Sequence, residues 1–177
     1  MKFTADWFSS HIPHWERLLR PLAGQPIQAL EIGSYEGRSA VWLLQEILTH
    51  PESRLTCVDI WDQEAVQSRF RANVQETGRG LQVIECQGDS VQALRPLTGP
   101  FDFIYIDGSH EARDVLTDIS FAWPTLRVGG LLALDDYKWV GDVEFPPQSA
   151  IDPFLQLWMT QIEVLHKGRQ VIVRRRV

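Results

Sequence analysis

The chain has 177 residues, a length that suits one domain with a sizeable core. Its hydrophobic content of 44% and charged content of 23% are typical of a globular protein, and its formal net charge of −6 does not favour binding to nucleic acid. No apolar run is long enough to cross a membrane, and the two cysteines fall inside predicted strands, where reduced buried thiols are usual. We therefore expect a cytoplasmic protein.

The first 25 residues are expected to form a helical N-terminal extension of a single domain that spans residues 1–177. Apolar side chains recur at helical spacing between Thr4 and Leu22, and Pro13 inside this pattern predicts a break or a kink. The segment would cap the sheet or form part of a lid, although periodic aromatic residues are also typical of simple packing.

A buried strand, a turn with two glycines and a helix are predicted between residues 29 and 48. Ile27, Leu30 and Ile32 supply the apolar side chains that indicate a central parallel strand. Gly33 and Gly37 let the backbone turn sharply and let a ligand approach closely. Such a unit is typical of a small-ligand site at the carboxyl end of a parallel sheet.

The spacing of the glycines in this turn distinguishes between several classes of ligand. A dinucleotide fingerprint needs G-x-G-x-x-G and a P-loop ends in Lys-Ser/Thr, whereas this chain has Glu31-x-Gly33-x-x-x-Gly37. The Glu31 carboxylate would repel phosphates and attract an ammonium or sulfonium group. An ordinary strand-to-helix turn with incidental glycines is the alternative. The pattern E-x-G-x-x-x-G resembles motif I of the class I S-adenosylmethionine-dependent methyltransferases.

The second predicted strand, Arg54–Ile60, carries an acidic residue near its end. The Asp59 side chain is placed to accept hydrogen bonds from both hydroxyl groups of a ribose, and methyltransferases of this class have Asp or Glu there. Asp62 is an alternative for this role, or it caps the helix predicted over Gln63–Glu76.

The third predicted strand, Leu81–Gln87, is followed by Gly88-Asp89-Ser90 and a short helix within Val91–Leu97. The tripeptide resembles the loop that contacts the adenine ring in the same class of methyltransferases. A plain turn with a helix cap explains Asp89 and Ser90 equally well.

Three aspartates follow the next two predicted strands. Asp107 ends the strand Phe101–Asp107, the helix Glu111–Leu126 comes next, and Asp135-Asp136 follows the strand Leu131–Leu134 after the break at Val128-Gly129-Gly130. Because adjacent parallel strands end at the same edge of a sheet, we expect the three carboxylates to lie close together. Aspartate is also common at strand ends simply because it caps turns and helices.

Clustered carboxylates repel one another unless a cation lies among them. Oxygen ligands suit Mg²⁺, or another hard cation such as Mn²⁺ or Ca²⁺, better than they suit zinc. The sequence therefore predicts a divalent metal site.

The stretch IDGSHEARDVLTDISFAWPTLRVGGLLALDDY resembles the methyltransferase-24 family and, with the glycine turn, extends the resemblance over most of residues 29–137. It is similar to the macrocin and mycinamicin O-methyltransferases and to catechol O-methyltransferase. The resemblance implies S-adenosylmethionine as cofactor, a metal bound by Asp107, Asp135 and Asp136, and a base at His110. A helix-capping or solvent-exposed histidine is the alternative for His110.

The C-terminal part is expected to contain a loop, a helix and a final hairpin. Trp139, Val140 and Phe145 of the loop would contact an apolar acceptor or cover the core. The strands Gln161–His166 and Gln170–Arg175 are predicted to pair as a hairpin. The expected fold is thus α/β: a Rossmann-like, seven-stranded, mostly parallel sheet with helices on both faces and a C-terminal antiparallel hairpin.

The predicted reaction is S-adenosylmethionine-dependent methylation of a small-molecule hydroxyl, with a metal and with no nucleic-acid or membrane partner. His110 and Asp107 are the catalytic candidates, and homo-oligomer formation is left open. The cofactor-binding candidates are Glu31, Gly33, Ser34, Gly37, Asp59, Ile60, Asp89, Ser90 and Asp107. A nicotinamide-dependent oxidoreductase and a non-catalytic ligand-binding module are the alternatives.

Overall fold

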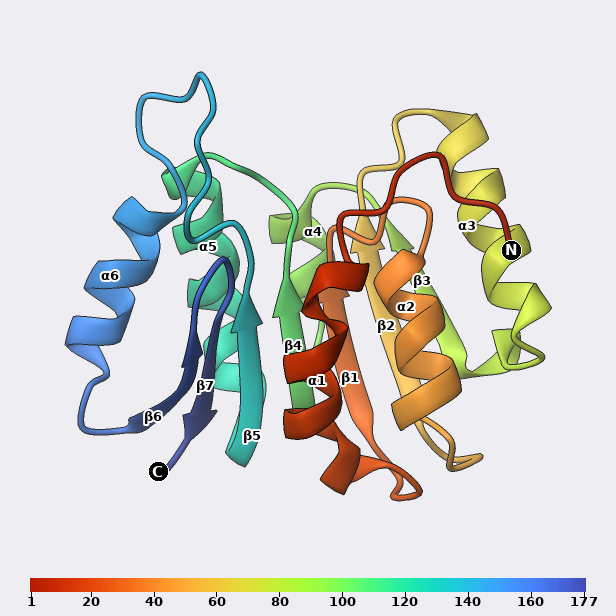
Figure 1. Ribbon diagram of the computed structural model, residues 1–177, viewed down its shortest axis with the longest axis horizontal. Helices are drawn as coiled ribbons and strands as arrows, with labels where there is room; N and C mark the ends of the chain where they lie inside the picture. Colours follow the sequence, from red (N-terminus) through yellow and green to blue (C-terminus); the bar gives the residue numbers. More distant parts are fainter. The chain divides into compact units, whose positions relative to one another are not determined.

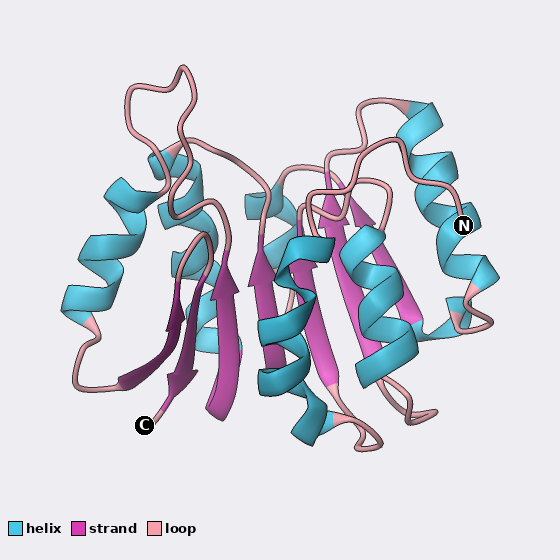
Figure 2. Cartoon of the chain, in the orientation of Figure 1, coloured by secondary structure: helices cyan, strands magenta, loops and turns pink.

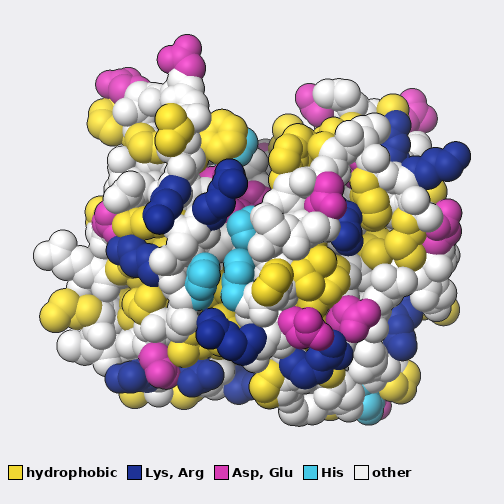
Figure 3. All heavy atoms as spheres, viewed as in Figure 1, with side chains coloured by type: hydrophobic (Ala, Val, Ile, Leu, Met, Phe, Trp, Pro, Cys, Tyr) yellow, Lys and Arg dark blue, Asp and Glu magenta, His cyan; other side chains and the backbone are white.

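The computed structural model describes residues 1–177, in which helices and strands alternate along the chain (Figures 1 and 2). The chain divides into two compact units, Met1–Gly88 and Asp89–Val177. None of its helices is both long and apolar enough to cross a membrane. Basic, acidic and apolar side chains all reach the surface on the face shown in Figure 3.

The first unit contains three parallel strands in the order β3-β2-β1. They are β1 (Gln28–Ile32), β2 (Arg54–Asp59) and β3 (Val83–Gln87). The side chains of β1 and β2 are almost all buried, as expected for strands covered on both faces, whereas those of β3 are partly exposed. The register of β1 and β2 places Glu31 beside Cys57.

Helices of the first unit include α1 and α2, which lie in front of β1 and β2 in the view of Figure 1. The α-helices are α1 (Ile12–Leu19), α2 (Arg38–Trp42) and α3 (Glu64–Glu76). Single turns of other helix types are η1 (Ser9–His11), η2 (Arg20–Leu22), η3 (Leu43–Ile47) and η4 (Gly80–Gln82). The rings of Phe8, Trp15 and Trp42 contact one another in the core.

The N-terminal helix is shorter than predicted, because α1 begins at Ile12 and residues 4–8 are not helical. Pro13 lies in the first turn of α1, where its missing N–H removes no helical hydrogen bond. The proline therefore marks the start of this helix rather than a kink within it.

The second unit contains four strands in the order β4-β5-β7-β6. They are β4 (Phe101–Ile106), β5 (Leu126–Leu134), β6 (Ile162–Lys167) and β7 (Val171–Arg175). Strands β4 and β5 are parallel, and β7 pairs antiparallel with both β5 and β6. The predicted C-terminal hairpin is confirmed.

Strand β5 starts five residues earlier than predicted, because the glycines expected to separate the helix from the strand lie inside the strand. Opposite β4, the pairing moves from Leu126 to Leu131 between Phe101 and Phe103, so the intervening residues form an irregularity. Gly129 has a φ of +81°, a backbone conformation that glycine adopts without strain. The glycines thus lie within an irregular part of the strand instead of between the helix and the strand.

Helices of the second unit are α4 (Ser90–Leu94), α5 (Ala112–Ala122), η5 (Trp123–Thr125) and α6 (Gln148–Leu157). Helix α5 packs against α6. It ends before the predicted Leu126 because Pro124 follows at once in η5. Across the two units, parallel pairing of β1 with β2, β2 with β3 and β4 with β5, followed by the hairpin, confirms the predicted Rossmann-like class.

Candidate active-site residues

The turn between β1 and α2 depends on its two glycines. Gly33 has a φ of +87° and Gly37 a φ of +80°, and both values favour glycine. The Gly33 N–H donates a hydrogen bond of 2.8 Å to the carbonyl oxygen of Val58, at the end of β2. A Cβ atom at Gly37 would lie 2.9 Å from the fully buried ring of Phe70. The backbone conformation of this turn therefore depends on glycine at both positions, and a side chain at Gly37 would also collide with Phe70.

The Glu31 carboxyl group is completely buried behind this turn. The hydroxyl groups of Ser34 and Ser39 donate to its two oxygens at 2.8 and 2.5 Å, and the Cys57 thiol lies 3.6 Å away. Burial raises the pKa of Glu31 to about 7, although these hydrogen bonds favour the charged form. Glu31 thus connects the turn to the start of α2, while its predicted contact with the methionine part of a ligand stays a prediction.

The Asp59 side chain joins the end of β2 to the glycine turn. Its Oδ2 accepts a hydrogen bond of 2.8 Å from the Tyr35 N–H, and its Oδ1 accepts one of 2.8 Å from the Trp61 N–H. Asp59 is half-buried and the following Ile60 is exposed. Because each carboxylate oxygen has two lone pairs, Asp59 can also accept hydrogen bonds from ligand hydroxyl groups.

The Asp89 and Ser90 side chains, predicted to contact adenine, have partners in the second unit. Asp89 caps α4 by accepting hydrogen bonds from the N–H groups of Val91 and Gln92, at 3.0 and 3.4 Å. The Ser90 hydroxyl donates to the buried Asp118 carboxylate at 2.5 Å. Burial raises the pKa of Asp118 to about 6. The helix-cap alternative is supported for Asp89, Ser90 has a different protein partner, and the adenine contact of both residues stays a prediction.

Two of the three predicted metal ligands converge on a buried tyrosine. The Tyr105 hydroxyl lies 2.9 Å from Asp107 Oδ2 and also bonds to Asp135 Oδ2. The Gln170 side-chain amide donates to the same Asp135 oxygen at 2.7 Å. Burial, together with the charges of Asp107 and Asp135, raises the pKa of Tyr105 well above its usual value. The tyrosine therefore stays protonated, and its single O–H hydrogen is shared between these two carboxylates.

The third carboxylate, Asp136, contacts the predicted base. His110 Nε2 lies 2.9 Å from Asp136 Oδ2, and the His110 ring stacks on Trp139 with centroids 3.8 Å apart and planes at 9°. Asp136 has a φ of +55°. Burial and the neighbouring Asp135 raise its pKa, whereas His110 acts in the opposite direction. The carboxylate and the indole together fix the orientation of the imidazole ring.

The predicted metal set does not form a metal-binding group in this structure, in which no three His, Cys, Asp or Glu side chains are arranged to hold an ion. Asp107 and Asp135 are turned toward the Tyr105 hydroxyl, and Asp136 is turned toward His110. Asp107 and Asp135 thus share the tyrosine hydroxyl as a partner, whereas Asp136 has a different one. As they lie here, these side chains do not fit a bound cation.

Exposed apolar side chains follow Asp136 in the loop before α6. Val140 is 96% exposed and Phe145 57% exposed, and Trp139 presents one face of its indole to His110. The Phe145 carbonyl oxygen accepts a hydrogen bond of 2.8 Å from the Ala112 N–H at the start of α5. The loop is thereby tied beside the helix that follows His110.

Tyr105 and Gln170 of these groups, and Glu36 of the glycine turn, were missed by sequence reasoning. Tyr105 precedes Asp107 by two positions on a strand, so the alternation of strand side chains could have placed both on one face. Gln170, far along the chain on the hairpin, carries no such signal. Glu36 lies between the two glycines, but nothing in the sequence shows that its carboxylate is buried.

Residues 30–137 match the model of the methyltransferase-24 family, which is described as a methyltransferase domain. The match covers more than half of the chain, so the chain belongs to this family of methyltransferases, as predicted. The mycinamicin VI 2''-O-methyltransferase of Micromonospora griseorubida is 28% identical over an alignment of 139 residues, and the match covers 73% of this chain and 31% of that relative. The chain spans less than half the length of the curated relatives it matches.

Solved structures share the fold. The O-methyltransferase TomG from Streptomyces achromogenes, in complex with SAM, is 19% identical with a TM-score of 0.71, over 93% of this chain and 80% of that chain. The MycE methyltransferase of the mycinamycin biosynthetic pathway, in complex with Mg and SAH, is 20% identical with a TM-score of 0.69, and the match covers 97% of this chain and 51% of that chain. At these identities the likeness establishes the fold alone.

Proposed function

We propose that this chain transfers a methyl group from S-adenosylmethionine to a hydroxyl oxygen of a small molecule. The family and the names of its relatives support this reaction type. The observation that carries the proposal is the distance of 2.9 Å between His110 Nε2 and Asp136 Oδ2, because a carboxylate-oriented histidine is an arrangement suited to general-base catalysis.

The first unit would bind the cofactor. Gly33 and Gly37 leave the turn without side chains, Asp59 has lone pairs for ribose hydroxyls, and Ile60 offers an exposed apolar side chain. When bound, S-adenosylmethionine supplies a methyl group that is activated by its positive sulfur. The further predicted contacts are Glu31, Ser34, Asp89, Ser90 and Asp107.

The second unit would bind the acceptor and remove its proton. With a proton on Nε2 donated to Asp136, the neutral imidazole of His110 has Nδ1 as its basic nitrogen. The acceptor hydroxyl would give its proton to Nδ1 as its oxygen bonds to the methyl carbon and the carbon–sulfur bond breaks. Asp136 would stabilise the positive imidazole that results.

Magnesium stays a separate prediction, with Asp107, Asp135 and Asp136 as its ligands. It is supported by the resemblance and by the presence of Mg in the MycE complex. The side chains as they lie here do not fit the ion, so no step of the proposed reaction is assigned to it.

The first experiment is calorimetric titration of the full chain with S-adenosylhomocysteine and, separately, with NAD. We expect S-adenosylhomocysteine to bind and NAD not to bind. The substitution Asp59→Asn should weaken S-adenosylhomocysteine binding by about tenfold or more, because a hydrogen bond to a charged acceptor contributes roughly 1.5–3 kcal/mol. The exposed Asp62, the alternative ribose partner, provides the matched control Asp62→Asn, which should bind like the wild type. Binding of NAD without S-adenosylhomocysteine would contradict the proposal.

A further inference from the structure

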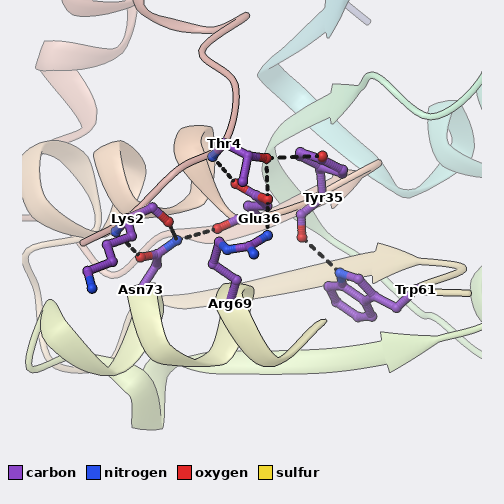
Figure 4. A network of polar contacts seen from close by, with 7 residues as sticks. All are labelled: Lys2, Thr4, Tyr35, Glu36, Trp61, Arg69 and Asn73. Carbon is purple, nitrogen blue, oxygen red and sulfur yellow. Dashed lines mark hydrogen bonds and ion pairs between the residues drawn. The ribbon is translucent and has the colours of Figure 1, made fainter. Parts of the chain in front are cut away.

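The first eight residues, Met1–Phe8, here called the N-terminal strap, contact the glycine turn within the first unit (Figure 4). The backbone N–H and the hydroxyl of Thr4 each donate a hydrogen bond of 2.6 Å to the carboxylate of Glu36. Glu36 lies between Gly33 and Gly37, and only 1% of its side chain is exposed. A buried carboxylate of the turn is therefore a binding point for the strap.

Helix α3 contacts the same residue from its other side. The Arg69 guanidinium forms a hydrogen-bonded ion pair with the Glu36 carboxylate. The Asn73 side-chain amide donates to the main-chain oxygens of Glu36 and Lys2, at 2.9 Å each, and accepts from the Lys2 N–H at 2.8 Å. Figure 4 shows these side chains directed toward one another, with Glu36 at the centre.

The charge state of Glu36 differs from that of Glu31, although both carboxylates are buried near the same turn. Burial alone would raise the pKa of Glu36, but the hydrogen bonds from Thr4 and the charge of Arg69 lower it below the usual value. Glu36 is thus ionised at neutral pH, and its ion pair with Arg69 persists there.

The strap also contacts the residue that positions Asp59. The rings of Trp7 and Tyr35 lie with centroids 5.2 Å apart, and Trp7 is 70% exposed. Tyr35 adopts a φ of +47°, which an L-residue rarely adopts unless its surroundings hold it there. Its N–H is a donor to Asp59 Oδ2, so the strap, the turn and Asp59 form one connected set.

We propose that Glu36 is a positioning residue of the cofactor site and that the N-terminal strap is part of that site. Glu36 fastens the strap and α3 to the glycine turn, and the fastened turn presents Asp59 to the nucleoside through the Tyr35 N–H. This inference rests on the proposed function, because it assigns the ligand of the turn to the methyl donor.

The test compares two arginines of α3. Arg69 pairs with Glu36, whereas Arg71, two residues further on, forms an exposed pair with Glu85 at 2.7 Å. We expect Arg69→Met to weaken S-adenosylhomocysteine binding about tenfold, the usual scale for losing a hydrogen-bonded charge partner. The matched control Arg71→Met should bind like the wild type, and the conservative Arg69→Lys should restore most of the affinity.

Two further measurements separate positioning from general stability. Thr4→Val removes the hydroxyl bond to Glu36 but keeps the N–H bond, so it should weaken binding about threefold with little change in melting temperature. Chymotrypsin should cleave after Trp7 faster in Arg69→Met than in Arg71→Met, and S-adenosylhomocysteine should slow cleavage of the wild type.

The outcomes can be told apart. If the wild type binds S-adenosylhomocysteine and the Arg69 and Thr4 variants bind it equally well, Glu36 is structural only and this inference is overturned while the proposed function stands. If the wild type does not bind the ligand at all, the proposed function fails and takes the inference with it.

Discussion

The glycine turn of the first unit and the strand ends of the second unit both contain acidic side chains, but these carboxylates have different partners in the two units. Around the turn, the carboxylates of Glu31 and Asp59 accept hydrogen bonds from serine hydroxyls and main-chain N–H groups. At the strand ends, Asp135 bonds to a tyrosine and an amide, and Asp136 contacts the partly exposed His110.

The role of each carboxylate therefore depends on the group that contacts it. Glu31 and Asp59 accept hydrogen bonds from residues of the turn itself, so these acids hold the turn in shape. An imidazole partner is itself reactive, so Asp136 orients a group that can move a proton. We expect changes near the turn to alter stability and ligand affinity, and changes at His110 to alter the rate of transfer.

The largest effect is expected on the pH dependence of the free energy of unfolding, which Glu31→Gln should reduce. The folded state keeps a proton on Glu31 up to pH of about 7, whereas the unfolded chain loses it near the usual pKa of 4.5. Stability contributed by the protonated group is complete below pH 4.5 and is lost as the pH rises toward 7. The shift corresponds to about 3 kcal/mol as an upper estimate, at 1.36 kcal/mol per pKa unit.

Urea unfolding of the wild type and of Glu31→Gln at several pH values measures this contribution. The variant should lose less stability than the wild type between pH 4.5 and 7, because its amide does not titrate. Asp118, whose pKa is also raised, is present in both proteins and cancels in the comparison. Parallel stability curves for the two proteins would show that Glu31 does not titrate in this range.

A smaller difference, of about 2 kcal/mol between two matched variants, should come from the glycine turn itself. Gly37→Ala forces a Cβ atom against the buried Phe70 ring at a positive φ, whereas Gly24 has a similar φ of +78° and open space around it. Both substitutions incur the cost of the backbone conformation, about 1 kcal/mol. The steric conflict should make Gly37→Ala less stable than Gly24→Ala by about a further 2 kcal/mol.

Chemical denaturation of the two alanine variants measures this difference directly. Equal losses of stability would mean that Phe70 moves aside freely, and the turn would then be less constrained than we infer.

Patterns local in the sequence were enough to predict the fold. The apolar runs of β1, β2 and β4 and the hairpin at the C-terminus were identified correctly, because buried parallel strands and hairpins have short-range signatures. The predicted boundaries of an element were wrong where a contact with a distant part of the chain determines where that element begins or ends. Strand β5 continues through Gly129 because β4 pairs with it on both sides of the irregularity.

The candidate site was predictable in its residue types but not in its contacts. Asp107, Asp135 and Asp136 were recognised, yet their division between Tyr105 and His110 depends on side-chain directions that spacing does not reveal. The strap was expected as packing or part of a lid. Its bond to Glu36 joins positions 32 residues apart, which no local pattern indicates.

The most direct measurement of the central claim is the rate at which S-adenosylhomocysteine forms from S-adenosylmethionine with hydroxyl acceptors such as mycinamicin VI and catechol as probes. His110→Ala should reduce the rate with an acceptor that the wild type methylates by about 100-fold or more, as expected for loss of a general base. It should leave S-adenosylhomocysteine affinity unchanged, and His50→Ala, in the first unit, should behave like the wild type. A His110→Ala variant that methylates at the wild-type rate would contradict the account.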